Sequence, residues 1–486
     1  MLSLLEKNEQ EIITVLSVFF SHPQKKRWTL NELHNETNLS QWKITQALEG
    51  IQRIIEHNNW QDRIQLEWTA NEVIAYLKKN ISMDFIRKHL YKSSIIYNLC
   101  LEALLNPGFN LYRFLDEYGI SYSTLYRRLK PLKKMLKEFN LCFTLKADSL
   151  IQGEEAQIRY FLYFFLIEAY NTDFLKTYKT SIVDRGINHF SVSHDASFSQ
   201  QKRLKVFLII THNRILNNHL IESFHCPNRT DALLSHLHEH FHQFFDLLNL
   251  PSEAKRSEAQ FAAFFLFSID GFSKKRVAEQ LTTAELDGTT QTTQKLLAFI
   301  QDYFAITFTP EDTLFLTVNI ELLLAHASFF SGCLLIADIT MSDYLTSNFF
   351  FIGNNFLLSF IAFVQEQMSV KNKDFFCFNV LPIVSETLAG YIKTSINILL
   401  VSSISKTFED TLKKMISDIS PLPVNFVHQH QSIDLIITDS YNGLYEAFPE
   451  TKYFCWSYIP TEEDWQRLKT SLLSLAKATS DNVTRK

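Results

Sequence analysis

The stretch GISYSTLYRRLKPLKKMLKEF, residues 119–139, decides how this chain folds at its front. Leu125, Leu129, Leu132 and Leu136 recur at helical spacing, which predicts one buried face. Six Lys and Arg side chains lie between residues 121 and 137, and no acidic residue precedes Glu138. The side chains that project outward or flank the leucines are hydroxylated or cationic: Tyr122, Ser123, Tyr126, Arg127, Lys130, Lys133, Lys134 and Lys137. Such a face is either solvated or built to bind an anionic surface.

A second copy of this unit lies 81 positions upstream, where residues 29–51 align with residues 110–132. The apolar positions of the two segments coincide, and Ser40 falls on Ser121. Each copy reads as a short helix, a tight turn and a longer helix. An apolar helix precedes each copy, and a β-like segment follows it. That order is typical of a winged helix-turn-helix.

Helix caps and turn residues support this interpretation. Thr29 and Glu32 form a capping-box pattern, which predicts a helix start. Asn38 and Gly119 stand where the two turns are expected. Asn and Gly are the residues that adopt the left-handed backbone conformation most easily, which supports a turn at each position. The remaining predicted caps are Asn110, Ser40 and Ser121.

We expect the second helix of each copy to face DNA. Arg can read guanine edges, while Lys, Ser and Tyr can hold phosphates. In the second copy Pro131 should kink or end the helix, which confines base contacts to residues 121–128 and leaves the lysines beyond for the backbone. Predicted contacts there are Ser121, Tyr122, Ser123, Thr124, Tyr126, Arg127, Arg128, Lys130, Lys133 and Lys134. The first copy offers a less basic set: Ser40, Gln41, Trp42, Lys43, Thr45 and Gln46.

The composition predicts a multidomain, mainly α protein. The chain has 486 residues, 46% of them hydrophobic, with 42 Phe but only 11 Gly and 11 Pro. Long helical patterns therefore have few breakers and large apolar faces to pack. Residues 1–160 hold 21 Lys+Arg against 18 Asp+Glu, whereas residues 161–486 hold 26 against 34. The basic part comes first, as expected of an anion-binding front on an acidic body.

The cysteines and the apolar segments indicate where the protein works. The six Cys are far apart and show no paired spacing, so neither a disulfide framework nor a thiolate zinc site is predicted. Charged residues interrupt the N-terminus where a signal peptide would need an apolar run. The most apolar later stretch, YFLYFFLIEAY, is too short to span a bilayer. We expect a cytoplasmic protein without membrane contact.

The motifs SYSTLYRRLKPLKKML and LIQGEEAQIRYFLYFFL resemble a known family. Their order, a recognition helix followed by Gly153, Glu154, Glu155, Ile158, Arg159 and Tyr160, looks like the second DNA-binding unit of the Mga and AtxA family of Gram-positive virulence regulators, which are relatives of the BglG-type antiterminators. The resemblance implies two winged helix-turn-helix units, two all-helical phosphotransferase-regulation domains (PRD) and a C-terminal α/β domain like enzyme IIB. The corresponding segments are 1–78, 79–164, 165–280, 281–393 and 394–486.

Patterns in the later segments agree with that order. Phe-rich helical stretches fill residues 165–275 and 287–393, with a polar linker-like stretch TTAELDGTTQTTQ between them. From Ser395 strands alternate with helices, which predicts a small α/β domain with a parallel sheet.

The resemblance also implies histidine phosphorylation by phosphotransferase proteins, and dimerisation through the C-terminal domain. The best local matches for a phosphorylated His are His212 and His326, followed by His219. Val206 and Phe207 stand where antiterminators carry an acid-His pair. The C-terminal domain has Ser402 and Ser403 at the position of the enzyme IIB phosphocysteine, so we expect no phosphotransfer there.

Two alternatives remain open from the sequence. The first is RNA-binding antitermination. The second is zinc hydrolysis, because His238, Glu239 and His242 fit the His-Glu-x-x-His pattern and Glu258 could supply a third ligand. The favoured hypothesis needs no catalysis, metal or cofactor. It predicts a transcriptional regulator that binds duplex DNA through helices at 41–55 and 121–130, with limited base specificity and a strong salt dependence.

Overall fold

The structure is a computed structural model that describes residues 4–78, 81–105, 109–145, 150–169, 181–194, 197–225, 234, 241–280, 290–333, 352–391, 395–402, 405–428, 432–439 and 447–483. The chain divides into two compact units. The first comprises Met1–Leu266 with Phe329–Asp338, and the second Phe267–Ser328 with Ile339–Lys486. Helices dominate both, as the composition predicts.

The first compact unit begins with a winged helix, which we call the first winged helix (residues 4–78). Its antiparallel sheet has the strand order β1-β3-β2, and the side chain of Trp28 on β1 is buried. After the third helix, β2 and β3 pair as an antiparallel hairpin, which forms the wing. The elements are α1 (Lys7–Ser21), β1 (Arg27–Thr29), α2 (Leu30–Thr37), α3 (Gln41–His57), β2 (Ile64–Trp68) and β3 (Glu72–Leu77).

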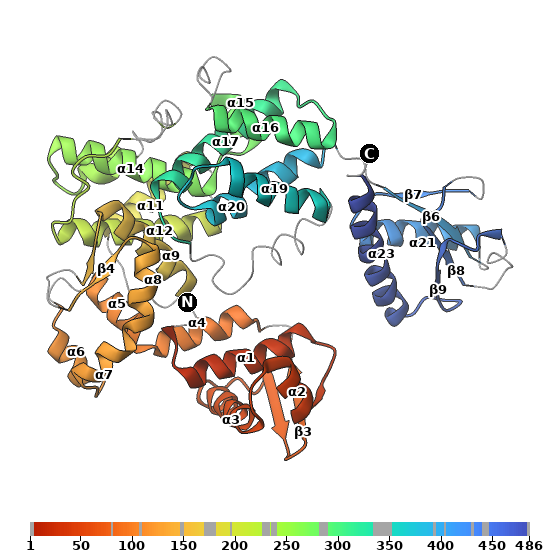
Figure 1. Cartoon of the computed structure of the whole chain (residues 1–486), viewed down its shortest axis with the longest axis horizontal. Coiled ribbons are helices and arrows are strands. Elements are labelled where there is room, and N and C mark those ends of the chain that lie inside the picture. The colour runs from red at the N-terminus through yellow and green to blue at the C-terminus, as the bar shows by residue number, and fades with distance from the viewer. Residues whose placement is uncertain are drawn as a thin grey trace. The chain divides into compact units, whose positions relative to one another are not determined.

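The second winged helix (residues 81–152) follows the same order, but two helices stand where the first winged helix has one, and its wing strands are shorter (Figure 1). The hairpin of β4 and β5 pairs Cys142 with Gln152 and Phe143 with Ile151. Its elements are α4 (Met83–Ser93), α5 (Ile95–Leu105), α6 (Leu111–Glu117), α7 (Tyr122–Arg128), α8 (Lys130–Glu138), β4 (Cys142–Phe143) and β5 (Ile151–Gln152). The predicted winged helix-turn-helix order is therefore present in both copies.

The rest of the first compact unit is helical and packed with aromatic rings. Tyr160 stacks on Phe330 with 4.4 Å between ring centroids, and its hydroxyl donates to the Gly332 carbonyl. Such ring pairs contribute about 0.5–1.5 kcal/mol beyond the area they bury. The helices are α9 (Glu155–Ala169), α11 (Ser181–His194), α12 (Phe198–Leu216) and α14 (Ser252–Asp270), of which α14 ends in the second compact unit.

The second compact unit contains all of α17 (Pro310–Phe329) except its last residue, and residues 314–327 of this helix are all buried. A helix that is buried on every side has no polar stripe, so its polar residues need internal partners. Asn319 exchanges hydrogen bonds with the Phe272 backbone, and Glu321 accepts from Thr290. The other helices are α15 (Lys274–Gln280), α16 (Gln291–Phe304), α19 (Asn354–Gln367) and α20 (Lys373–Leu388). The linker-like stretch at 282–294 lies partly outside the described residues.

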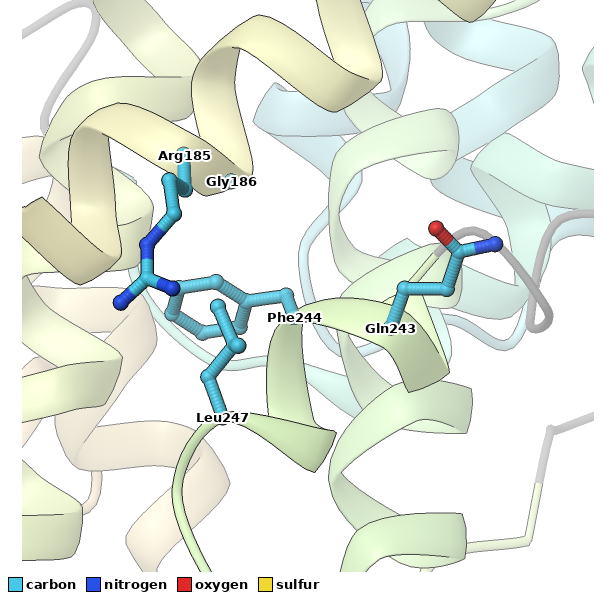
Figure 2. Close-up of a pocket in the computed structure, with 5 residues that line it drawn as sticks. All are labelled: Arg185, Gly186, Gln243, Phe244 and Leu247. Carbon is cyan, nitrogen blue, oxygen red and sulfur yellow. The ribbon is translucent and has the colours of Figure 1, made fainter.

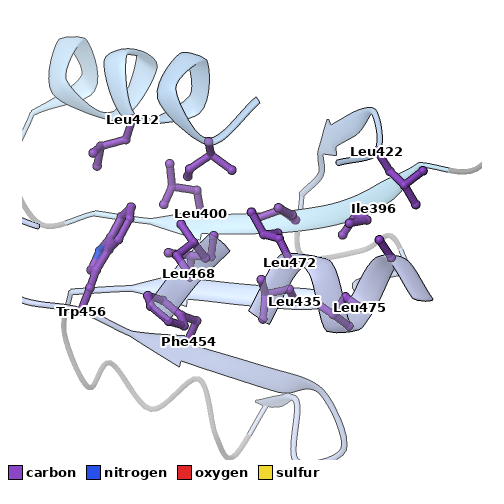
Figure 3. Close-up of a cluster of buried hydrophobic side chains, with 14 residues drawn as sticks. Ile396, Leu400, Leu412, Leu422, Leu435, Phe454, Trp456, Leu468, Leu472 and Leu475 are labelled. Atoms are coloured by element: carbon purple, nitrogen blue, oxygen red, sulfur yellow. The ribbon is translucent and has the colours of Figure 1, made fainter. Parts of the chain in front are cut away.

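The last part of the second compact unit contains a parallel four-stranded sheet of order β7-β6-β8-β9, as the alternating pattern after Ser395 predicts. Figure 3 shows Leu412 of α21 and Leu468 and Leu472 of α23 in one buried cluster with β6 and β8. The elements are β6 (Ile396–Val401), α21 (Lys406–Ile419), β7 (Val424–Phe426), β8 (Leu435–Thr438), β9 (Lys452–Cys455) and α23 (Glu462–Val483). Among the described residues, none of the helices has the length and apolar character that a membrane crossing requires.

Candidate nucleic-acid interface

The turn of the second winged helix is built as its sequence predicts. Asn110 caps α6 by accepting from the Arg113 backbone N–H at 3.1 Å. Gly119 adopts φ +60°, the left-handed conformation. Ser121 then caps α7, because its hydroxyl accepts from the Thr124 N–H at 3.2 Å. The turn therefore fixes the angle at which α7 leaves the core.

A break at Leu129 separates α7 from α8. Pro131 has no backbone N–H to donate, so the helical hydrogen-bond pattern is interrupted there, although Lys133 N–H still bonds the Leu129 carbonyl at 2.9 Å. Leu129 ends α7 and caps α8. The prediction that Pro131 kinks or ends the helix is confirmed: α7 stops at Arg128 rather than Lys130, and α8 begins directly after Leu129.

The buried face of α7 and α8 is the predicted leucine stripe. Leu125, Leu129, Leu132 and Leu136 are all fully buried. Burying such a side chain contributes about 1.5–3 kcal/mol, which is enough to hold both helices in one orientation. The opposite side chains consequently face solvent.

The exposed face carries hydroxyls, rings and cations. Ser121 shares hydrogen bonds with the hydroxyls of Ser123 and Thr124. Tyr126 is 51% exposed, and the Lys133 ammonium lies 4.3 Å from its ring centroid. The members exposed on this face are Ser121, Tyr122, Ser123, Tyr126, Arg127, Lys130, Lys134 and Lys137, while Thr124, Arg128 and Lys133 are half-buried. We call this set of side chains the α7–α8 face.

Arg128 differs from the other cations of the α7–α8 face. Its Nε lies 3.0 Å from Oε1 of Glu6, and its side chain is 30% exposed. Glu6 caps α1 of the first winged helix. Arg128, a predicted DNA contact, is thus paired with an acid about 120 residues upstream that no local sequence pattern indicates.

In the first winged helix the equivalent helix, α3, presents a weaker surface for an anion. Lys43 is paired with Glu11 at 2.6 Å, and the Gln41 amide bonds Asn31 at 2.8 Å. Trp42 is 71% exposed. Ser40 caps α3, Thr45 is half-buried, and Gln46 is exposed and bonds Glu49 at 3.2 Å.

The two copies also carry opposite charges at matching positions. The 81-residue repeat places Glu49 on Lys130 and Glu56 on Lys137. Residues 1–78 hold 8 Lys+Arg against 10 Asp+Glu, whereas residues 79–160 hold 13 against 8. The second winged helix therefore carries the positive charge of the front of the chain.

A buried ion network holds α9, the helix that follows the second winged helix, against α12 and α14. Arg159 on α9 is fully buried and binds both oxygens of Glu258 at 2.5 and 2.8 Å, as well as Glu155 at 2.9 Å. Arg214 on α12 binds Glu155 at 2.6 Å. Burial alone lowers the pKa of the Arg159 guanidinium, but Glu258 and Glu155 outweigh it and raise that pKa, so the group stays charged. An Arg inside the apolar run IRYFLYFFL was the signal for this network, because a buried cation needs carboxylate partners.

The same network bears on the zinc alternative. Glu258 also accepts from the Ile221 N–H at 3.0 Å and is fully buried, so its oxygens are occupied by Arg159 and the backbone. His238 and Glu239 lie outside the described residues, and His242 is half-buried. The part of the chain that the structure describes contains no group of three His, Cys, Asp or Glu side chains able to hold a metal.

The three candidate histidines differ in access. His326 is fully buried, stacks on Phe375 at 4.1 Å and bonds the Ser268 hydroxyl at 2.7 Å. His212 is 5% exposed, and His219 is half-buried next to Arg214 and Arg159. Burial lowers the pKa of all three imidazoles.

Two further places carry features related to chemistry or ligand binding. Ser402, at the end of β6, donates to Asp439 at 3.1 Å, and Ser403 lies outside the described residues. A small cavity of about 160 Å³ is lined by Arg185, Gly186, Gln243, Phe244 and Leu247 (Figure 2). None of these five described lining residues is an acid or a nucleophile.

The comparison with protein families agrees with this geometry. The model described as the Mga helix-turn-helix domain matches residues 79–166, which include α4 to α8, the β4–β5 hairpin and most of α9. The match confirms the resemblance of this segment to the Mga helix-turn-helix domain. A search of curated proteins finds no match. The chain thus carries a helix-turn-helix domain that supports a DNA-binding transcriptional regulator.

Proposed function

We propose that this protein regulates transcription by binding duplex DNA, with the α7–α8 face of the second winged helix as the main contact. The carrying observation is that Ser121, Tyr122, Ser123, Arg127 and Lys130 are exposed on α7 and α8, whose leucine stripe is fully buried. Arg127 can reach base edges in a major groove, while the lysines of α8 neutralise phosphates.

The first winged helix is proposed as a second, weaker contact through Ser40, Gln41, Trp42, Thr45 and Gln46. Because α3 carries little net positive charge, its contribution comes from neutral polar and aromatic contacts. Few side chains in either helix can read bases, so binding depends on DNA shape and on phosphates.

The later domains are proposed to regulate this binding. We assign residues 165–280 and 281–393 to PRD-like helical domains and 394–486 to an enzyme IIB-like domain through which the protein forms a homodimer. The front third is assigned to winged helices at 1–78 and 79–164. We propose a cytoplasmic location, because the regulators that the chain resembles are bacterial and their DNA lies in the cytoplasm.

Phosphorylation by phosphotransferase proteins is proposed to act on a histidine of these domains. His219 has the best access of the three candidates, because His212 and His326 are buried. A phosphate there would add negative charge beside Arg214 and Arg159, where it competes with Glu155 for the guanidiniums.

A mobility-shift titration tests the DNA contact. Replacing Arg127 and Arg128 together by Ala should weaken duplex binding at least tenfold, since one good base contact is worth about 1–3 kcal/mol. An unchanged titration would show that the assigned surface does not bind DNA.

Competition with hairpin RNA tests the antitermination alternative. Antiterminators of the BglG type begin with a small β-rich RNA-binding domain, whereas residues 4–78 form a winged helix. We expect duplex DNA to compete far better than hairpin RNA for the protein. Preferential displacement by the hairpin would support the alternative.

A further inference from the structure

The N-terminal end of α1 touches the second winged helix at the C-terminal end of α7. Glu6 holds Arg128 at 3.0 Å, and the Glu6 backbone N–H donates to Glu9 at 2.9 Å. Both carboxylates therefore lie at the same end of α1. An Arg held by a carboxylate through a charge-assisted hydrogen bond is less available for a phosphate or a base.

Two more contacts lie at the same place. The Ser93 hydroxyl donates to Oε1 of Glu9 at 3.3 Å, and the Ser94 hydroxyl donates to the Leu4 carbonyl at 3.2 Å in a buried position. Burial raises the pKa of the Glu9 carboxyl, consistent with its position between the two winged helices. Residues 4–9 thus bond to α4, to the α4–α5 junction and to α7.

We propose that Arg128 is a positioning residue that holds the first winged helix against α7, rather than a DNA contact. The proposal rests on the proposed function, because the two winged helices must bind one duplex for their relative placement to matter. Arg127 then remains the Arg of α7 that faces the DNA.

A fixed contact between the two winged helices changes the affinity of the protein for DNA without adding a contact to the DNA itself. Once the second winged helix is bound, the first is held at a high effective concentration next to the same duplex. Loosening the contact lowers that concentration, so affinity falls only on DNA long enough for both winged helices. A phosphate or base contact at Arg128 would instead lower affinity on any duplex that α7 binds.

The first test is a charge swap, measured as affinity for a duplex of about 30 base pairs, roughly three helical turns. Arg128→Glu places an acid beside Glu6 and Glu9, and we expect binding to weaken about tenfold. Adding Glu6→Arg to Arg128→Glu rebuilds the pair with its charges exchanged, and should restore affinity to within about threefold of wild type.

The matched control carries the same net charge without rebuilding the pair. Arg127→Glu combined with Glu6→Arg should stay at least tenfold weaker than wild type. If the Arg128→Glu, Glu6→Arg protein is as weak as this control, Arg128 contacts DNA and the proposal is overturned. Melting curves of all variants identify any loss caused by unfolding.

The second test compares DNA lengths with Arg128→Ala. On a duplex of about 10 base pairs, which accommodates one winged helix, the variant should match wild type, whereas on about 30 base pairs it should be weaker. Equal losses on both lengths would contradict a positioning role. Failure of the wild-type protein to bind either duplex would refute the proposed function itself, and so is distinguishable from failure of this inference.

Discussion

The variant Glu258→Gln should destabilise the first compact unit strongly. In the folded protein Arg159 and Arg214 share two carboxylates, Glu155 and Glu258, and the side chains of Arg159 and Glu258 are 0% exposed. Removing the charge of Glu258 leaves two guanidiniums with one carboxylate. Leaving a buried charge uncompensated in this way costs about 3–5 kcal/mol.

Thermal melting measures this cost. For a domain of 150–250 residues, 1 kcal/mol shifts Tm by about 2–4 °C, so we expect Glu258→Gln to lower Tm by roughly 6–20 °C. The matched control is Asp246→Asn, because Asp246 pairs with Lys255 near the start of α14 but is 61% exposed. An exposed pair of this kind contributes less than about 1 kcal/mol to the free energy of unfolding, so the control should change Tm much less than Glu258→Gln does.

The network reasoning also predicts a rescue. Replacing Arg159 and Glu258 together by Met keeps the Glu155–Arg214 pair and removes both members of the buried pair, so most of the lost Tm should return. If Glu258→Gln melted within 2 °C of wild type, or if the double variant were worse than the single one, the network would not carry the stability assigned to it.

Three more changes test separate parts of the structure. Burial lowers the pKa of His326 well below its usual value, so the folded state resists protonation of this side chain. The free energy of unfolding should therefore fall as the pH drops below about 6.5, the pKa of an unfolded His. In melting curves recorded from pH 8 to 5, His326→Gln should make that fall smaller. Gly119→Ala should cost about 1 kcal/mol in denaturant titrations, because φ is +60° there while no atom lies within 4 Å of the added methyl; a larger loss would mean a clash that the structure does not contain. Glu49→Lys should steepen the salt dependence of DNA binding by about 0.9 in log–log slope, because it gives α3 the cation that α8 has at Lys130; Glu36→Lys on α2 serves as a control that should change the slope less.

Local patterns predicted most of the front of the chain. The caps Thr29, Asn110 and Ser121 and the turns at Asn38 and Gly119 were predictable because each depends on residues within four positions of itself. The strand and helix order after Ser395 followed for the same reason. Two elements of the first winged helix, β1 and β3, were missed, since β1 is only three residues long and its pairing with β3 spans more than 40 positions.

Contacts between distant residues could not be predicted from the sequence. Arg128 has the residue type of a DNA contact, and nothing near it in the sequence indicates that Glu6 binds it. The charges of α3 were visible, but the pairing of Lys43 with Glu11 depends on how α1 packs against α3. Similarly, local pattern and the family resemblance made His212 and His326 the best phosphorylation candidates, while tertiary packing buries both.

The salt dependence of DNA binding tests the central claim most directly. Replacing Lys130, Lys133 and Lys134 by Ala removes three cations from the α7–α8 face, and the log–log slope of affinity against salt should become shallower by up to about 2.7. A control with the same change in net charge, Lys255, Lys275 and Lys295 to Ala in the helical domains, should leave the slope within about 0.5 of wild type. Equal slopes for the two triple variants would contradict the assignment of the α7–α8 face as the surface that binds DNA.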